Sequence, residues 1–110
     1  MASGFVLQQA ADGQFYFNLR ADNNETILTS ERYQARASAQ NGIRSVQANA
    51  PLDQRYSRRT ASDGRHYFVL LAGNGEPIGT SEQYSSASEM EAGIAAVMRT
   101  APSAPEVDQT

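Results

Sequence analysis

The sequence contains no cysteine and no lysine, and its single histidine is His66. The absence of cysteine excludes thiol catalysis, disulfide bonds and cysteine-ligated zinc or iron–sulfur sites. The absence of lysine excludes Schiff-base chemistry and the phosphate-binding lysine of a P-loop. One histidine cannot supply a multi-histidine metal site or two Ser-His-Asp triads. We therefore expect no metal site and no cofactor, and the sequence identifies no catalytic residue.

A net positive charge and a long apolar run are also missing. Twelve acidic residues outweigh nine arginines, and the net charge of −3 disfavours binding to phosphate backbones. No segment approaches the roughly 18 apolar residues of a membrane helix. The start of the chain, residues 1–5, lacks the basic and apolar regions of a signal peptide. We therefore expect a cytoplasmic protein that has no membrane partner and for which a nucleic-acid partner is disfavoured.

The chain contains an internal repeat. A shift of 51 positions aligns residues 4–51 with 55–102 without a gap, and 19 of the 48 pairs are identical. We assign repeat one to residues 1–52 and repeat two to residues 53–102. One repeat of this size has too little interior to be stable alone, so we expect the two to form a single folded domain. The remaining residues, 103–110, are rich in proline and small polar side chains, and we expect a disordered tail.

Each repeat reads as three strands followed by a helix. Asp12-Gly13 and Asp63-Gly64 are typical of a tight hairpin turn, in which glycine supplies the positive φ angle. Residues 15–21 alternate between apolar and polar side chains, as a half-buried strand does. The apolar residues that follow helical spacing are Ala39, Ile43, Val46 and Ala50 in repeat one, and Met90, Ile94, Val97 and Ala101 in repeat two. The prediction is an α+β domain: two tandem β-β-β-α repeats forming one antiparallel sheet, with both helices packed on one face and a pseudo-twofold relation between the repeats.

The predicted helices carry glycine at matching places. Gly42 and Gly93 lie inside the helices, where glycine costs about 1 kcal/mol relative to alanine. We interpret both as points where the helix approaches the sheet or the other helix closely. Ser88, with Glu91, is the predicted cap of the second helix and Ser38 that of the first, and a proline follows each helix.

The repeated pattern resembles a known family. In order it is a turn, Tyr-Phe-x-Leu-x-Ala, Thr-Ser-Glu-x-Tyr, and a helix with Gly-Ile-x-x-Val. Over residues 4–102 this is similar to the YegP family of small bacterial proteins, whose members carry the unit once, as dimers, or twice in tandem. The resemblance implies β-β-β-α repeats that build a common sheet, and it implies no activity. Leu28 against Gly79 and Phe15 against His66 depart from a strict repeat.

Two matching polar segments form the first candidate site. As a duplicated ligand pocket, they would supply hydroxyls, a carboxylate and a tyrosine wall. As a structural feature, they would turn the chain from strand to helix, with serine and threonine bonded to local backbone and tyrosine in the core. The structural interpretation is favoured, because such a connection needs these residue types in any case. The residues are Thr29, Ser30, Glu31 and Tyr33, and Thr80, Ser81, Glu82 and Tyr84.

The first hairpin of repeat two is rich in arginine, with Arg55, Arg58, Arg59 and Arg65. These side chains could contact an anion or a phosphate. A solvated hairpin with pairing to Asp53 and Asp63 is the favoured interpretation. Strand alternation also places Arg58 and Arg59 on opposite faces, so they do not form one patch.

The second strand of repeat two is apolar on both faces. Phe68, Leu70 and Ala72 form the core-facing set, but the opposite set is apolar too. If the helices cover only one face, the other face carries an apolar and aromatic patch of the kind that marks a partner or self-association surface. The alternative is that the tail or a crossing strand covers it. This candidate binding surface consists of Tyr16, Tyr67, Val69 and Leu71.

Three functions follow from these features. The favoured one is a non-catalytic binding or protein-interaction module that uses the candidate binding surface. The second is a small enzyme or ligand-binding protein with duplicated sites at Glu31 and Glu82. The sequence shows no pair of a nucleophile and a general base for such an enzyme. The one histidine, His66, has Phe15 as its counterpart in repeat one. The third is a weak single-stranded nucleic-acid binder that uses the arginine-rich hairpin, with Tyr56 and Tyr67 for stacking.

Overall fold

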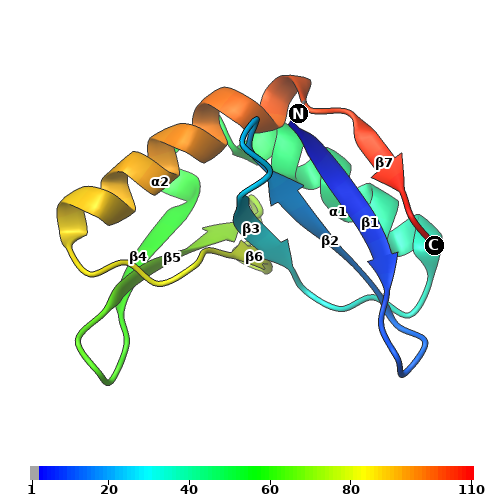
Figure 1. Ribbon diagram of the computed structural model, residues 1–110, viewed down its shortest axis with the longest axis horizontal. Helices are drawn as coiled ribbons and strands as arrows, with labels where there is room; N and C mark the ends of the chain where they lie inside the picture. The colour runs from blue at the N-terminus through cyan, green and yellow to red at the C-terminus, as the bar shows by residue number, and fades with distance from the viewer. Residues whose placement is uncertain (1–2) are drawn as a thin grey trace.

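The structure is a computed structural model that describes residues 3–110, and it is an α+β fold (Figure 1). Three strands and a helix occur in that order twice. The first set is β1 (Gly4–Gln9), β2 (Phe15–Arg20), β3 (Thr26–Ser30) and α1 (Arg36–Asn49). The second set is β4 (Tyr56–Thr60), β5 (His66–Leu71), β6 (Pro77–Thr80) and α2 (Ala87–Thr100). Short 3-10 helices, Asp53–Arg55 and Ala101–Ser103, follow α1 and α2, and β7 (Glu106–Asp108) comes last.

The turns form where the sequence predicts them. Gly13 and Gly64 have φ angles of 88° and 89°, which a side chain would disfavour. In the next turns, Asn24 and Gly75 also take positive φ, at 68° and 86°. Both repeats therefore use the same hairpin chemistry to set the register of their strands.

All strands belong to one seven-stranded mixed sheet with the order β4-β5-β6-β3-β2-β1-β7. The prediction of an antiparallel sheet is wrong at one end, because β7 pairs with β1 in parallel. The prediction of a disordered tail over residues 103–110 is also wrong, because this segment contains the strand β7. The Phe5 amide donates to the Pro105 carbonyl at 2.8 Å, and the Gln109 amide donates to the Leu7 carbonyl at 2.9 Å. The buried Ala104 anchors the segment that leads into β7.

The repeats join at the centre of the sheet, where β3 pairs with β6 and Thr29 lies opposite Thr80. These two threonines are equivalent in the 51-residue repeat. One row of register partners crosses the whole sheet through this pair. In order across the seven strands, the row is Val107, Val6, Asn18, Thr29, Thr80, Val69 and Ser57.

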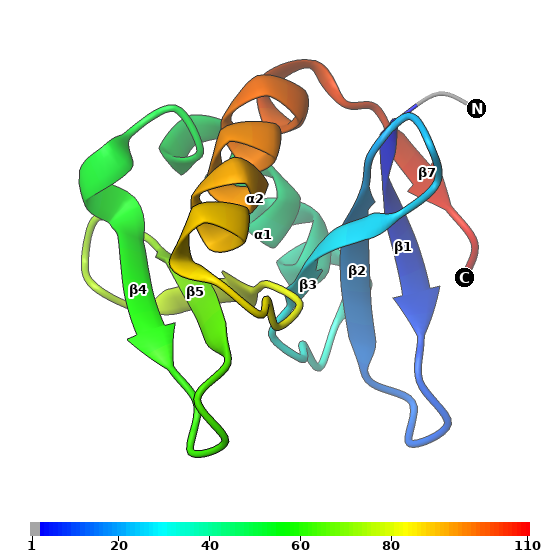
Figure 2. The same ribbon diagram turned by 60° about the vertical axis from the view of Figure 1, so that its left-hand side comes forward.

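One hydrophobic core lies between the helices and the sheet, on the side opposite this row. The odd-numbered residues of β2 contribute Phe17 and Leu19, and β5 contributes Phe68 and Leu70. Each helix contacts strands of both repeats: α1 packs on β2 and β6, and α2 packs on β5 and β3. Figures 1 and 2 show both helices on the same side of the strongly twisted sheet. Burial of this shared interior is the main stabilising term, and neither repeat contains it alone.

The helix starts differ from those predicted. The N-cap of α2 is Ser86, whose side chain accepts from the Glu89 amide at 3.1 Å, two residues before the predicted Ser88. The N-cap of α1 is Ala35, which makes no side-chain cap hydrogen bond, and Ser38 lies inside the helix. The residue at the helix start matters, because a polar N-cap satisfies amides that the helix leaves unpaired. Among residues 3–110, no helix combines the length and apolar character needed to cross a membrane.

Candidate functional site

The serines of the two polar segments are tied to backbone. Ser30 Oγ accepts from the Phe17 amide at 2.8 Å and donates to the Glu31 carbonyl at 2.7 Å. Ser81 Oγ makes the same two bonds, from the Phe68 amide at 3.0 Å and to the Glu82 carbonyl at 2.7 Å. Both serines are buried. These bonds satisfy strand amides where the chain leaves the sheet, so neither hydroxyl projects into open space.

The tyrosines of the same segments lie beneath the helices. Tyr33 exchanges two backbone hydrogen bonds with Phe15, and its ring stacks on Phe17 with 6.5 Å between centroids. A Cβ placed on Gly42 would lie 2.5 Å from the Tyr33 hydroxyl oxygen. Tyr84 lies against Gly93 in the same way. The helix glycines are therefore explained by close approach of the tyrosines.

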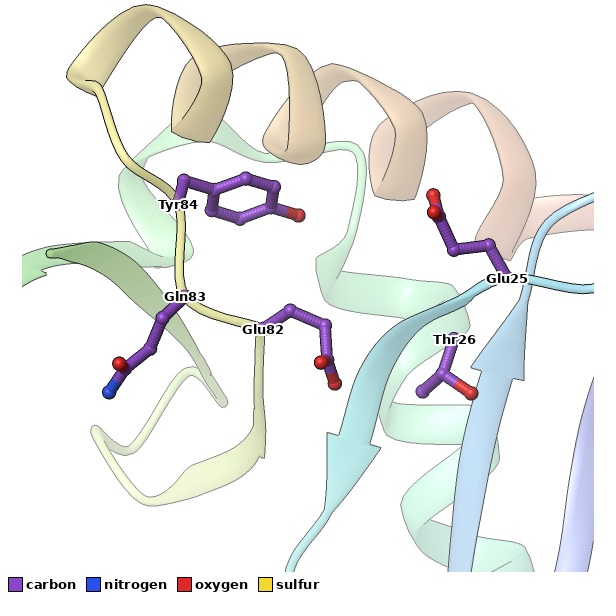
Figure 3. Close-up of a pocket in the computed structure, with 5 residues that line it drawn as sticks. All are labelled: Glu25, Thr26, Glu82, Gln83 and Tyr84. Atoms are coloured by element: carbon purple, nitrogen blue, oxygen red, sulfur yellow. The ribbon is translucent and has the colours of Figure 1, made fainter.

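The two glutamates of the segments are exposed, and Glu82 lines a pocket. This seam pocket has a volume of about 310 Å³ and is lined by Glu25, Thr26, Glu82, Gln83 and Tyr84. In Figure 3 the Glu82 carboxylate and the Tyr84 hydroxyl point toward β3, and Gln83 points away. The pocket thus combines residues of both repeats. Chemically it offers two carboxylates and two hydroxyls around a small volume.

The seam is asymmetric because Leu28 and Gly79 differ. A Cβ on Gly79 would lie 2.9 Å from Leu28 Cγ and 3.1 Å from the Thr29 carbonyl oxygen. The leucine side chain therefore fills the space above the glycine, and the strands close tightly on that side. There, the Glu31 amide donates to the Ile78 carbonyl at 3.1 Å. The Leu28–Gly79 contact and this hydrogen bond therefore lie at one end of the β3–β6 strand pair. The pocket lies at the other end, beside Glu82.

Burial raises the pKa of three tyrosines. For Tyr33, desolvation is the main cause and the charge of Glu31 adds to it. For Tyr84, desolvation is again the main cause, followed by Glu25 and Glu82. The pKa of Tyr56 is raised most strongly, by burial and then by Asp53. All three phenols therefore remain hydrogen-bond donors at neutral pH.

The arginine-rich hairpin of repeat two is internally paired at several points. Arg58 contacts Glu91 at 2.6 Å and Asp53 at 2.8 Å, and Arg65 lies 3.9 Å from Asp63. These partners also hold the pKa of the Arg58 guanidinium above its usual value, with the Glu91 hydrogen bond as the main cause. Tyr56 cannot stack on a base, because it is buried and its hydroxyl donates to the Ala50 carbonyl at 2.7 Å.

The lone histidine has a backbone role. His66 exchanges two main-chain hydrogen bonds with Tyr84, as Phe15 does with Tyr33. Within residues 3–110, no side-chain hydrogen bond joins His66 to a nucleophile or an acid, and no group of three or more His, Asp or Glu side chains is close enough to hold a metal. His66 thus occupies the same backbone position in repeat two that Phe15 occupies in repeat one.

We call the side of the sheet that faces away from the helices the helix-free face. Its side chains in β1 to β3 form a polar network. Gln8 donates to Asn18 at 2.8 Å, Asn18 donates to Thr29 at 3.0 Å, and the Tyr16 hydroxyl donates to Gln8 at 3.2 Å. The Arg32 guanidinium lies 4.8 Å from the centroid of the Tyr16 ring, in a cation–π contact. This half of the face is therefore held by its own hydrogen bonds.

The other half of the helix-free face is less polar. Here Val69 takes the place of Asn18 and Leu71 that of Arg20. Tyr67 and Leu71 are half-buried, but Val69 is only 4% exposed and is not available for contact. The candidate binding surface therefore divides: Tyr16 belongs to the polar network, and Tyr67 with Leu71 remains accessible.

The two outer edges of the sheet differ, which the sequence did not indicate. At one end β7 covers β1, and its acidic side chains contact α1: Glu106 accepts from Gln40 at 2.8 Å, and Asp108 lies 3.4 Å from Arg36. At the other end, no strand formed by residues 3–110 lies on the outer side of β4 (Figure 2). A three-residue strand next to a proline is too short to show periodicity in the sequence. The sequence therefore predicts neither β7 nor the difference between the two sheet edges.

Comparison with known proteins places the chain in a family. The model of the domain of unknown function DUF1508 matches twice, over residues 10–57 and 61–108. Each match begins at a hairpin and ends in the strand after a helix, so the matched unit is offset from the predicted repeat bounds. A UPF0339 protein of Bordetella pertussis is 55% identical over 108 residues, which is 98% of this chain and 97% of that protein.

The similarity extends to solved structures. The solution structure of YegP from Escherichia coli, described as a protein of unknown function, superposes with a TM-score of 0.94 at 46% identity, covering 100% of this chain and 95% of that one. A UPF0339 protein from Shewanella oneidensis gives 0.91 at 41% identity, covering 98% and 92%. None of these relatives is named for an activity. The paired motifs, both DUF1508 matches and these relatives agree, and the chain belongs to the YegP (UPF0339) family.

Proposed function

We propose that this protein is a non-catalytic interaction module that binds an extended, acidic segment of a partner protein along the open edge of β4. The observation that carries the proposal is the contrast between the two sheet edges. The chain covers β1 with its own acidic strand, whereas β4, its equivalent in the repeat, is covered by no strand of the part of the chain that the structure describes. Addition of a strand to an exposed edge is a general mode of peptide recognition.

The backbone of β4 has free groups for such a strand. In β1 the Phe5 amide and the Leu7 carbonyl point outward to β7. A shift of 51 places Tyr56 and Arg58 at the same positions, and strand alternation adds Thr60. The Tyr56 amide is already bonded to Asp53, so the open groups are those of Arg58 and Thr60. The backbone of Arg59, which lies between them, faces β5 and takes part in the pairing of β4 with β5.

Charge supports an acidic partner. Arg58 and Arg59 project on opposite faces of β4, and both are exposed. Arg58 has two carboxylate partners, but Arg59 bonds only to the Ser57 hydroxyl, at 3.1 Å, among the described residues. Within the chain, the acidic residues of β7 are held by Arg36 and Gln40 of α1. Tyr67 and Leu71 lie one strand further in and supply apolar contact area for residues that flank the paired segment.

The same proposal gives the duplicated polar segments a structural role. Ser30, Ser81, Tyr33 and Tyr84 bond to strand backbone or pack under helices, which supports folding rather than catalysis. We also propose that a pseudo-twofold axis passes between Thr29 and Thr80 and relates the two β-β-β-α repeats. The register of these two equivalent residues supports the axis.

The test uses a peptide with the sequence of residues 103–110, which is acidic and contains the strand β7, Glu106–Asp108. Titration into isotope-labelled protein should shift the backbone NMR signals of Arg58 and Thr60 more than those of Phe5 and Leu7, whose edge is occupied. Arg59→Glu should weaken binding, and Thr60→Pro should weaken it by removing an outward amide. Arg44→Glu, an equal charge change on exposed α1, and Thr60→Ala should leave it unchanged.

A second peptide with lysine in place of both acidic residues separates charge from backbone pairing. The proposal requires this peptide to bind more weakly at low salt. Equal binding of the two peptides, or shifts confined to β1, would contradict the proposal. So would the absence of any shift at Arg58 and Thr60 at millimolar peptide.

A further inference from the structure

A cavity on the helix-free face has a distinct chemistry and lies away from β4. Its volume is about 300 Å³, and it is bounded by β1, β7 and the end of β2. The register places Gly4 opposite Arg20 and Val6 opposite Val107, so these side chains share one face. Gly4 has no side chain, and a Cβ there would lie 3.3 Å from both Pro105 O and Val107 Cγ2. The lining is Ser3, Gly4, Val6, Arg20, Asn24, Pro105, Val107 and Gln109.

Arg20 is the unusual member of this lining. Its Nε is buried and has no hydrogen-bond partner among residues 3–110. Other arginines of the chain have polar partners, for example Arg36 with Asp108 and Arg55 with Asn49. Buried donors are normally satisfied, because an unmade hydrogen bond leaves the group without its solvation. No carboxylate of the described chain lies within ion-pair distance of this guanidinium.

We propose that this cavity binds a small monocarboxylate with an apolar body, and that the Arg20 guanidinium is the group that holds the carboxylate. A guanidinium presents parallel donors that match a carboxylate in a bidentate pair. Val6, Val107 and Pro105 form an apolar wall, which selects against a bare inorganic anion. Ser3, Asn24 and Gln109 are the remaining polar side chains, and none of them carries charge. The volume suits a small ligand rather than a large cofactor.

The second repeat has lost each part of this arrangement. Leu71 stands where Arg20 is, and Arg55 stands where Gly4 is, with its Nε donating to Asn49 at 2.8 Å. Ser57 replaces Val6, and none of the described strands takes the place of β7 beside β4. The common fold therefore does not require an arginine at position 20, since the same strand position accepts leucine. This inference is independent of the β4 proposal.

The experiment titrates benzoate and hexanoate into isotope-labelled full-length protein, with benzamide and inorganic phosphate as matched probes. The two carboxylates should shift the amides of Val6 and Gln109 and the Nε–H of Arg20. Benzamide should bind at least about tenfold more weakly, because it lacks the charge that strengthens the bidentate bonds. Phosphate should also bind more weakly, because it leaves the apolar wall uncovered.

Substitutions make the assignment specific. Arg20→Leu, which installs the residue of the second repeat, should weaken benzoate binding at least about tenfold. Arg20→Lys keeps the charge but loses the fork, and it should weaken binding by a smaller factor. Arg99→Leu is the charge-matched control and should bind as the parent does. Unchanged benzoate affinity in Arg20→Leu or Arg20→Lys, or equal binding of benzamide, would overturn the inference, as would no shift at Val6 and Gln109.

Discussion

The hydroxyl of Tyr33 occupies the space that a side chain at Gly42 would need, with 2.5 Å between the oxygen and the position of a Cβ. The second repeat contains the same pair in Tyr84 and Gly93. The polar segment before each helix thus fixes how closely that helix packs on the sheet. This pairing explains why glycine persists inside both helices despite its unfavourable helix propensity.

Gly42→Ala should therefore destabilise the protein, although alanine favours helix by about 1 kcal/mol. Overpacking in a closed interior costs about 1–3 kcal/mol, and the Tyr33 ring is stacked on Phe17 and cannot move freely. Urea denaturation should show a lower unfolding free energy. Tyr33→Phe in the Gly42→Ala background should recover part of the loss. Gly73→Ala, at a site with only ordinary contacts, is the control, and an equal effect there would contradict the explanation.

Ser30→Ala and Ser81→Ala should each lower the unfolding free energy by about 1–3 kcal/mol, because each leaves a buried strand amide without its acceptor. The two losses should be similar, since the bonds are the same in both repeats. Thermal and urea unfolding would measure them, with Ser57→Ala on the edge strand as a control within about 0.5 kcal/mol of the parent. A neutral result in both repeats would remove the structural role of these serines.

Stability should fall in alkaline solution. Tyr33, Tyr56 and Tyr84 have a raised pKa in the folded protein, so their contribution is fully present below the unfolded-state pKa of about 10. Above that pH the unfolded chain loses phenolic protons that the folded chain retains, and the unfolding free energy decreases. Circular dichroism and tyrosinate absorbance, followed together, should show three tyrosines ionising with unfolding. Ionisation of all tyrosines while the fold persists would contradict this.

Removal of residues 105–110 should uncover the edge of β1. The truncation removes the pairing of β7 with β1 and the two backbone hydrogen bonds that flank it, and at about 1 kcal/mol net for each bond it predicts a drop in stability. The exposed edge should also promote self-association, because it presents unpaired amides to other chains. Analytical ultracentrifugation of the truncated and full-length proteins measures this. The double variant Arg36→Ala and Gln40→Ala keeps β7 but removes its side-chain contacts, and it should remain in the parental oligomeric state.

Much of the fold was readable because local chemistry dictated it. The Asp-Gly turns, the alternation in β2 and the apolar spacing in α1 and α2 each reflect a backbone requirement, and each is present in the structure. The cap at Ser86 was missed because serine also stands at 85 and 88, and only the helix start selects among them. β7 was missed because its pairing depends on where β1 lies, which no local pattern encodes.

The candidate sites were less predictable than the fold. Alternation identified Val69 as facing away from the core, but it did not reveal that this side chain is buried on that face as well. The seam pocket combines residues of both repeats, and at the other end of the same strand pair Leu28 fills the space above Gly79, a contact between residues 51 positions apart. The two repeats differ at Leu28 and Gly79, but only the pairing of β3 with β6 gives this difference a structural consequence.

Amide hydrogen exchange tests the contrast between the two sheet edges most directly. In the free protein the Phe5 amide should exchange slowly, because it is bonded to Pro105, and the Arg58 amide should exchange quickly. Addition of the acidic peptide should slow exchange at Arg58 and leave Phe5 unchanged. An Arg58 amide that is already protected in the free protein, or that exchanges at the same rate with saturating peptide, would contradict the account.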